Sequence, residues 1–184
     1  MDIKVDLSDV TINTERLILR PWQKTDLNDF FDYASVPGVG EMAGWPHHRF
    51  KITTKAVLQS FIEGKNIFAI ELRENNKVIG SIGLHASWAN EDPEYMHLKL
   101  KDLGYTLSKD YWGQGLTPEA AKAVICLCFE NLDIDAITCG HFRYNTQSKR
   151  VIEKCGFTFV KESTYHAIQL RKTIDDAKYI MYRS

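Results

Sequence analysis

Two different periods of hydrophobic residues follow one another along the chain, and each predicts its own kind of element. Apolar residues return every three or four positions from Thr25 to Ala34, which predicts a helix that Thr25 caps. The same spacing follows Thr53 and Thr54, so either threonine is expected to cap a second helix that buries Ala56, Val57, Phe61 and Ile62. The residues between these helices are rich in glycine, proline and histidine and are expected to form a long loop.

The period then changes to the alternation that is typical of strands. Strands are expected at residues 16–20, 67–72, 77–84, 96–107, 136–140, 158–165 and 178–182. Between them, residues 120–130 and 146–155 predict two more helices, the second closed by Gly156. The element order is therefore β-α-α-β-β-β-α-β-α-β-β.

This order predicts an α+β fold with a mixed α/β architecture. The strands in the middle of the chain are expected to form an antiparallel meander, and one βαβ crossover follows it. The order lacks the regular alternation of a doubly wound nucleotide-binding fold. No repeat, low-complexity tract or linker interrupts the chain, so residues 1–184 are expected to form a single domain with residues 1–13 as a lead-in segment.

A glycine-rich turn at residues 111–120 joins one predicted strand to the longest predicted helix. Gly113 and Gly115 let the backbone turn tightly and approach a ligand. The N–H groups at the start of the helix point toward that ligand, and the helix dipole favours an anion such as a phosphate. A Walker loop requires a lysine after its last glycine, and a Rossmann turn requires a third glycine or alanine; this turn has neither.

Composition narrows the range of functions. A formal net charge of −1, with 44% hydrophobic and 26% charged residues, indicates a globular protein without global attraction to nucleic acid or membranes. The chain starts without a signal-peptide pattern, and its longest apolar run, residues 123–129, is too short to cross a bilayer, so we expect a cytoplasmic protein. The cysteines and histidines lack metal-ligand spacing, so no metal site is expected, and Cys126 and Cys128, on different helix faces, are expected to be small apolar filler.

Several motifs resemble the GNAT N-acetyltransferase superfamily, and most of all its branch of ribosomal-protein N-terminal acetyltransferases. They are Thr14-Glu15-Arg16-Leu17 with Arg20, Gly44-Trp45-Pro46, Gly104-Tyr105, Trp112-Gly113-Gln114-Gly115, Glu119-Ala120, Asn145-Thr146-Gln147-Ser148 and Glu153-Lys154-Cys155-Gly156-Phe157. The resemblance implies a mostly antiparallel sheet that splays between its fourth and fifth strands, with acetyl-coenzyme A as the acetyl donor. Asp110 departs from the family pattern, because it stands where the turn often begins with arginine or glutamine.

The resemblance also implies how the cofactor is held. Main-chain N–H groups of the turn are expected to bind the diphosphate, and the pantetheine arm is expected to lie between the strands around residues 103–108 and 136–141, as an added strand would. Helix packing without any ligand is the competing interpretation of the turn. The expected cofactor-binding residues are Leu107, Trp112, Gly113, Gln114, Gly115, Leu116, Thr117, Asn145 and Ser148.

Acetyl transfer to an amine needs a group that removes a proton from the amine. Asp102 is the leading candidate, because it occupies the acidic position of the branch's E-x-G-Y motif, and it is expected to act directly or through a water. The alternative is a carboxylate that merely lies at the surface or the end of the sheet. Lys99 and Lys101 are expected to lower the pKa of Asp102 if they lie close to it.

Ser148 is the candidate donor of a proton to the departing thiolate. Many superfamily members use a tyrosine one turn later, where this chain has Ile152; the alternative is a serine that satisfies the helix backbone. Asn145 is expected both to cap this helix and to contact the cofactor. A backbone N–H near Tyr105 or Thr106 is expected to meet the oxyanion, with the choice left open, and the Tyr105 side chain is expected to pack in the cleft.

Other polar residues rank second. His47 and His48 lie in the loop where the family builds its acceptor site, so they are candidates for substrate contact. Glu119 is expected to place a negative charge at the positive end of the long helix. The cluster Lys149-Arg150 with Lys154 is expected to meet cofactor phosphates or solvent rather than nucleic acid.

These inferences together predict an enzyme that moves an acetyl group from acetyl-coenzyme A directly to a primary amine, on a protein N-terminus or on a small molecule. The alternative is a domain that binds acyl-coenzyme A without turnover. The expected partners are the amine acceptor and, by family habit alone, a second copy of the chain; neither nucleic acid nor a membrane is expected.

Overall fold

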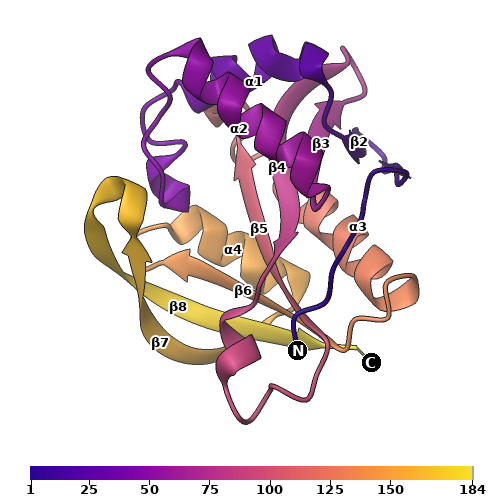
Figure 1. Ribbon diagram of the computed structural model, residues 1–184, viewed down its shortest axis with the longest axis vertical. Coiled ribbons are helices and arrows are strands. Elements are labelled where there is room, and N and C mark those ends of the chain that lie inside the picture. The colour runs from indigo at the N-terminus through magenta and orange to yellow at the C-terminus, as the bar shows by residue number, and fades with distance from the viewer. Residues whose placement is uncertain (184) are drawn as a thin grey trace.

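An eight-stranded sheet crosses the computed structural model, which describes residues 1–183 (Figure 1). The strands lie in the order β1-β2-β3-β4-β5-β6-β8-β7. Within the described residues, β5 and β6 are parallel and all other neighbouring strands are antiparallel. Their bounds are β1 (Ile12–Asn13), β2 (Leu17–Pro21), β3 (Ile67–Leu72), β4 (Lys77–His85), β5 (Leu100–Leu107), β6 (Ala136–Phe142), β7 (Thr158–Ala167) and β8 (Lys172–Tyr182).

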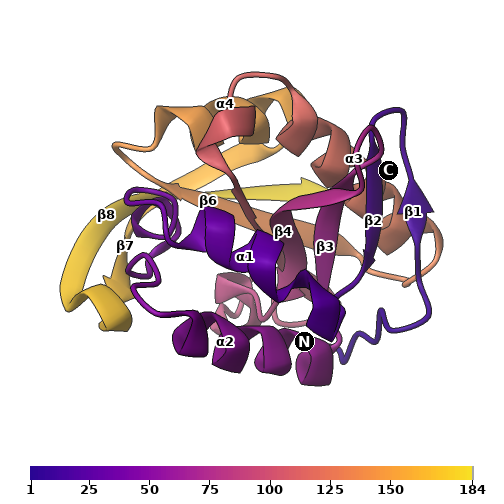
Figure 2. The same ribbon diagram turned by 90° about the horizontal axis from the view of Figure 1, so that it is seen from above.

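The α-helices cover both faces of this sheet (Figure 2). The helices α1 and α2 lie on one face and α3 and α4 on the other, and their bounds are α1 (Leu27–Ala34), α2 (Lys51–Gly64), α3 (Leu116–Glu130) and α4 (Thr146–Cys155). Hydrophobic side chains fill the space between the sheet and each helix layer. The arrangement confirms the predicted α+β class, with its mostly antiparallel sheet and one βαβ crossover.

The predicted cap of the first helix is wrong. Thr25 lies inside a short 3-10 turn, Lys24–Asp26, and α1 begins only after that turn. Asp26 holds the turn instead, because its Oδ2 accepts the main-chain N–H of Gln23 at 2.8 Å. The buried Asp26 also pairs with Arg20 at 2.9 Å, so a buried ion pair that periodicity does not reveal lies at the start of the helix.

The second helix starts earlier than predicted. It begins at Lys51, so Thr53 and Thr54 lie in its first turn and neither caps it. Thr54 is fully buried, and its hydroxyl lies 2.9 Å from Nδ1 of His48, which ties α2 to the loop before it. Ala56, which was expected to be buried, is exposed.

Several strand boundaries also differ from the prediction. β5 begins at Leu100, because the residues just before it form turns after Tyr95. β7 and β8 form one long hairpin that pairs from Thr158 to Ala167, and β8 begins earlier than expected. The lead-in segment packs on the sheet, since Val5 and Leu7 belong to the main hydrophobic core.

The parallel pair β5 and β6 is joined only at the beginning of each strand. Three residue pairs connect the strands, and the last of them is Asp102 with Thr138. Beyond that pair the two strands separate, although β5 continues to Leu107 and β6 to Phe142. This separation confirms the predicted splay between the fourth and fifth predicted strands, and it opens the centre of the sheet.

The four cysteines of the chain are free thiols. Cys128 and Cys139 are buried in the core, so the apolar-filler interpretation is confirmed for Cys128. It is wrong for Cys126, which is exposed on the opposite face of α3. Among residues 1–183, no helix has the length and apolar character that crossing a bilayer requires.

Candidate functional site

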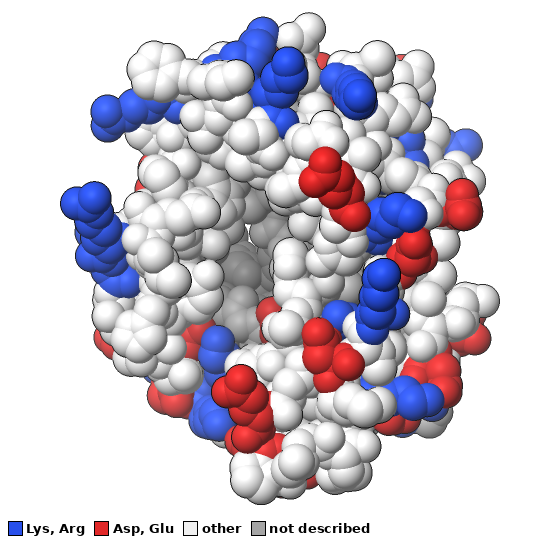
Figure 3. Space-filling view, viewed as in Figure 1, with Lys and Arg blue, Asp and Glu red and all other residues white. Residues whose placement is uncertain are grey.

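A cavity of about 920 Å³ opens where β5 and β6 separate. Figure 3 shows the hollow near the centre of this face of the molecule. The loop between α1 and α2 lines one side of the cavity, and the glycine turn, the ends of β4, β5 and β6, and α4 line the others. Nearly all the residues that the sequence singled out for the cofactor therefore meet at one place.

The glycine turn presents unpaired main-chain N–H groups at the mouth of this cavity. Gly113 and Gly115 both adopt a φ of +77°, in the left-handed region that favours glycine. Within residues 1–183, the N–H groups of Gly113, Gln114 and Gly115 donate to no protein acceptor. Leu116 opens α3, where no preceding turn can accept the first N–H groups. Such a set of donors at a helix start fits an anion.

Arg16, directly before β2, braces the turn. Its Nη1 donates to the carbonyl of Gln114 at 2.9 Å, and its Nη2 lies 2.7 Å from Glu119 in the first turn of α3. The hydroxyl of Thr14 donates to the same carboxylate at 2.6 Å. Glu119 does more than place a charge at the end of the helix, because it fixes the turn to the edge of β2.

Two further contacts hold the start of the turn. The indole N–H of Trp112 donates to the carbonyl of Leu107 at 2.8 Å, which closes the end of β5 onto the turn. The side-chain amide of Gln114 donates to the main-chain carbonyl of Asp110 at 3.0 Å. Asp110 stands where the family pattern has arginine or glutamine. Its main-chain carbonyl accepts a hydrogen bond that helps to hold the turn in shape.

Asp102 lies at the point where the strands part, and its environment differs from the one expected. Burial raises the pKa of Asp102 to about 6, despite the hydrogen bond from Thr138 and the nearby ammonium of Lys178, which both act in the opposite direction. Lys99 and Lys101 do not lower this pKa, because Lys99 pairs with Asp133 and Lys101 with Asp2 on the other side of the strand.

A short chain of hydroxyl groups ends at Asp102. The hydroxyl of Thr138 donates to Oδ1 of Asp102 at 2.6 Å, and the hydroxyl of Ser87 lies 2.8 Å behind it. The main-chain N–H of Ala89 donates to that serine at 3.0 Å. Because the Thr138 hydroxyl donates to the carboxylate, the Ser87 hydroxyl donates to Thr138. Each hydroxyl group therefore donates toward Asp102, which favours the ionised form of its carboxyl group.

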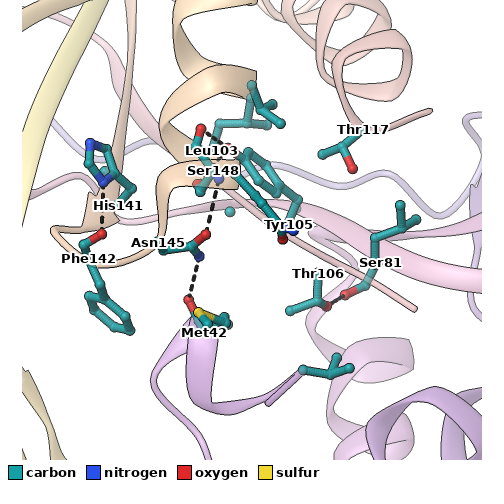
Figure 4. Close-up of a pocket in the computed structure, with 18 of the residues that line it drawn as sticks. Met42, Ser81, Leu103, Tyr105, Thr106, Thr117, His141, Phe142, Asn145 and Ser148 are labelled. Atoms are coloured by element: carbon teal, nitrogen blue, oxygen red, sulfur yellow. Dashed lines mark hydrogen bonds between the residues drawn. The ribbon is translucent and has the colours of Figure 1, made fainter. Parts of the chain in front are cut away.

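Asn145 and Ser148 meet Tyr105 on the opposite wall (Figure 4). Asn145 caps α4 as predicted, since its Oδ1 accepts the N–H of Ser148 at 3.1 Å, and its Nδ2 donates to the carbonyl of Met42 at 3.2 Å. The phenol oxygen of Tyr105 lies 2.9 Å from Oγ of Ser148. Sequence reasoning assigned Tyr105 to packing and missed this hydrogen bond, because the two residues lie 43 positions apart.

The histidines near the cavity differ in how far their side chains are already engaged within the protein. His48 lines the cavity, but its ring is tied to Thr54 inside the protein, and His47 pairs with Glu41 at 2.8 Å. His85, which the sequence did not favour, is the register partner of Asp102 and lines the cavity beside Gly104. The His85 ring is exposed to the cavity, and its partial removal from bulk water there, followed by the charge of Lys101, lowers its pKa, so the neutral form predominates at pH 7.

A buried ion pair lies on β8 at the same end of the cavity. Nζ of Lys178 donates to Oδ2 of Asp176 at 2.7 Å, and both side chains are largely buried. Oδ1 of Asp176 is buried without a hydrogen-bond partner among the described residues. The two positions share one face of the strand, which their spacing could have indicated, but only the fold brings them to Asp102. Within residues 1–183, no three His, Cys, Asp or Glu side chains gather closely enough to hold a metal ion.

The family model described as acetyltransferase (GNAT) domain matches residues 16–158. The chain belongs to the GNAT acetyltransferase family. The matched region begins at Arg16, which braces the turn, and includes every residue that the sequence assigned to the cofactor. The match confirms the family that the motifs resemble, and GNAT acetyltransferases use acetyl-coenzyme A.

Individual relatives of this GNAT chain are distant in sequence. An uncharacterized N-acetyltransferase, p20, of Bacillus licheniformis is 27% identical over 152 residues, which cover 80% of this chain and 82% of that protein. The FsC-acetyl coenzyme A-N(2)-transacetylase of Aspergillus fumigatus is 28% identical over 71 residues, which cover 39% of this chain and 30% of that protein. These names agree on acetyl transfer to nitrogen and differ in how much they say about the acceptor.

Solved structures of GNAT proteins share the fold along nearly the whole chain. A GNAT-family acetyltransferase from Bacillus anthracis superposes with a TM-score of 0.79 at 21% identity, covering 95% of this chain and 99% of that one. The ribosomal-protein-S5-alanine acetyltransferase from Vibrio fischeri superposes with a TM-score of 0.73 at 18% identity, and the match covers 96% of this chain and 98% of that one. At these identities the likeness concerns the fold and not the acceptor.

The residues of this GNAT chain fit the chemistry of coenzyme A. The unpaired N–H groups of the turn suit a diphosphate, and a Cβ built at Gly113 would meet no atom within 4 Å, so the space beside the turn is open. Arg150 and Lys154 of α4 line the same cavity and suit further phosphate groups. The separated part of β5 leaves backbone groups that β6 does not pair, where an extended arm can hydrogen-bond.

Proposed function

We propose that this chain transfers an acetyl group from acetyl-coenzyme A directly to a primary amine, on a protein N-terminus or on a small molecule. The observation that carries the proposal is the position of Asp102 at the last paired residue of β5, beside the gap that opens toward the glycine turn. A carboxylate at this point is within the cavity that would receive the thioester, and the open side of the cavity leaves room for an amine.

Asp102 takes the proton from the amine in this proposal. A carboxyl group whose pKa is about 6 is mostly ionised at neutral pH, yet it is a stronger base than an ordinary aspartate. An α-amino group has a pKa of about 8, so its neutral form is accessible at the same pH. His85 is the second candidate, because it is neutral and lines the same part of the cavity.

Acetyl-coenzyme A supplies an activated acyl group in the form of a thioester. The N–H groups of Gly113 to Thr117 hold and orient the diphosphate, with Arg16 keeping the turn in place. A main-chain N–H of Tyr105 or Thr106 meets the developing oxyanion, and Ser148 protonates the thiolate that leaves. No cysteine acts as a nucleophile, since the acetyl group passes directly to nitrogen.

The acceptor side of the cavity favours a cationic or peptide-like amine. Trp45 from the loop between α1 and α2, Phe142 from β6 and Tyr165 from β7 give the cavity an aromatic wall. The carboxylates of Asp102 and Asp176 face one ammonium, that of Lys178. One structural relative is named a ribosomal-protein-S5-alanine acetyltransferase. A relative in sequence is named an FsC-acetyl coenzyme A-N(2)-transacetylase, and this name does not point to a ribosomal protein, so both proposed acceptor classes belong in the test.

An acceptor panel tests the proposal. Purified protein is incubated with acetyl-coenzyme A and, separately, with peptides that begin with alanine or serine, a polyamine, and free amino acids. We expect coenzyme A release and an acetylated amine in equal amounts, both measured by mass spectrometry, because the exposed thiol of Cys126 would react with a colorimetric thiol reagent. Tight binding of acetyl-coenzyme A with no product from any amine would favour the alternative, a sensor without turnover.

A further inference from the structure

The second turn of α4 offers no acidic side chain to the cavity. Position 152 is an isoleucine that is 1% exposed and packs in the main core, so a phenol is not available from that part of the helix. Ser148, one turn earlier, is the hydroxyl of α4 that lines the cavity. A serine hydroxyl is a poor acid by itself, so a serine that gives up a proton needs a neighbour that returns one.

The structure provides such a neighbour from another element. Tyr105 lies on β5, past the last residue that pairs with β6, and its phenol oxygen is 2.9 Å from Oγ of Ser148 and 3.3 Å from the Ser148 carbonyl. Both side chains line the cavity, and Figure 4 shows them side by side on the wall formed by α4. The N–H of Ser148 is held by Asn145, so the serine is fixed on both sides.

Among residues 1–183, Tyr105 is the only side chain with a dissociable proton that hydrogen-bonds to Oγ of Ser148. Burial raises the pKa of the Tyr105 phenol well above its ordinary value, so the phenol carries its proton throughout the neutral range. The titratable groups beside it are the thiols of Cys139 from β6 and Cys155 from α4, and burial raises the pKa of both thiols. The Cys139 thiol, moreover, donates to the carbonyl of Leu103 and not toward Ser148.

We propose that Tyr105 is the source of the proton that reaches the leaving thiolate through Ser148. This inference rests on the proposed function. As the carbon–nitrogen bond forms and the carbon–sulfur bond breaks, the sulfur takes the hydroxyl proton of Ser148, and Ser148 takes the phenol proton of Tyr105. The proton lost by the amine goes to Asp102, and water reprotonates the phenolate after coenzyme A leaves. Because it acts through Ser148, Tyr105 is a positioning residue rather than a group that touches the thiolate.

The first test compares Tyr105→Phe, Ser148→Ala and the double variant with the unchanged protein, using acetyl-coenzyme A and the fastest amine of the panel. We expect kcat to fall about tenfold to a hundredfold in each single variant, with little change in KM, because coenzyme A thiol is a fair leaving group unaided. The double variant should be no slower than the slower single variant, since both residues belong to the same proton relay and losing either one interrupts it. Tyr95→Phe, a buried tyrosine outside the cavity, is the matched control.

The second test separates proton supply from packing. Replacing Tyr105 with a difluorotyrosine keeps the ring and the hydrogen bond but makes the phenol more acidic. The alkaline limb of kcat should move to lower pH in this variant, and a limb that stays in place would overturn the relay. Full kcat in Tyr105→Phe, or single effects that multiply in the double variant, would overturn it as well. An unchanged protein that binds coenzyme A but acetylates no amine would instead overturn the proposed function itself.

Discussion

Thr138 and Asp102 face each other in the last register pair of the parallel strands, and their side chains form a 2.6 Å hydrogen bond. This hydrogen bond lies where the pairing of β5 with β6 ends and the cavity begins. Thr138 is completely buried, so it holds the carboxylate from behind and leaves the other oxygen of Asp102 free toward the cavity.

Asp102→Asn should remove most of the activity. The amide cannot accept the proton of the amine, so kcat should fall by a factor of about 10² to 10⁴, the usual range for a positioned base. In the unchanged protein, kcat/KM should fall as the pH drops through about 6, because protonation of Asp102 removes the base. Steady-state rates from pH 5 to 9 check both outcomes. A variant that keeps full kcat would assign the role to another group, with His85→Ala as the next variant to measure.

Thr138→Val should shift the acid limb of that pH profile to higher pH. Valine has nearly the same shape as threonine, but it cannot donate to Asp102, and the lost hydrogen bond favoured the ionised carboxylate. The amine's own titration is common to both proteins, so the difference between their profiles isolates Asp102. Ser87→Ala, one step further along the hydroxyl chain, should shift the limb less. Identical limbs in all three proteins would show that the limb does not belong to Asp102.

The pKa of Asp102 also links stability to pH. Its pKa is about 6 in the folded protein and about 3.9 in an unfolded chain, so the stabilising contribution of this group is present below pH 4 and is lost as the pH rises through 6. Asp102→Asn has no such loss. Its Tm should therefore rise above that of the unchanged protein by about 6–12 °C at pH 8, because a pKa difference of about two units is worth roughly 3 kcal/mol and each kcal/mol shifts Tm by about 2–4 °C in a chain of this size. Near pH 4 the two Tm values should converge, and a constant difference at all pH values would contradict this reasoning.

Local patterns predicted the parts of the site that lie within one segment. The glycine turn, the start of α3 and the cap Asn145 are contiguous in sequence, so their geometry follows from residue type and spacing. Strand alternation also places Lys101 and Asp102 on opposite faces, which a stricter use of the two-residue period would have shown. The caps at Thr25 and Thr54 failed because buried partners, Arg20 and His48, override local preference.

Long-range contacts are what the sequence could not provide. The hydrogen bond between Tyr105 and Ser148 joins β5 to α4, and the raised pKa of Asp102 depends on burial under elements far along the chain. The ion pair of Asp176 and Lys178 enters the cavity only because β8 pairs with β6. Each of these features depends on which strands become neighbours. A single sequence does not show which side chains this pairing brings into contact.

Arg16→Ala should weaken the binding of acetyl-coenzyme A while leaving the chemistry nearly intact. The Arg16 guanidinium joins the Gln114 carbonyl to Glu119. Without it, the Gln114 carbonyl loses this donor, and Glu119 keeps only the hydrogen bonds from the Thr14 hydroxyl and from the main-chain N–H of residue 16. We expect KM for acetyl-coenzyme A to rise about tenfold, equivalent to roughly 1.4 kcal/mol, with kcat within about twofold of its original value. Lys55→Ala, at an exposed position on α2, is the control. An unchanged KM would mean that the turn keeps its shape without the brace.

Gly113→Ala separates the conformational role of a glycine from its role in leaving space for a ligand. Gly113 has a φ of +77°, so any Cβ there costs about 1–2 kcal/mol, yet that Cβ would meet no protein atom within 4 Å. Gly156 provides the matched control: its φ is +89°, a Cβ there would lie 3.7 Å from Met181, and it closes α4 outside the cavity. Both alanine variants should lose similar stability in thermal unfolding.

Their affinities for coenzyme A should nevertheless differ, because only the methyl group at position 113 projects into the open space where the diphosphate is expected. Isothermal titration with coenzyme A should show a Kd at least about tenfold weaker for Gly113→Ala and nearly unchanged for Gly156→Ala. Equal losses of affinity in the two variants would mean that strain, and not contact with the ligand, controls binding. Equal retention would move the diphosphate away from the turn, and the N–H groups of Gly113 to Gly115 would then need another explanation.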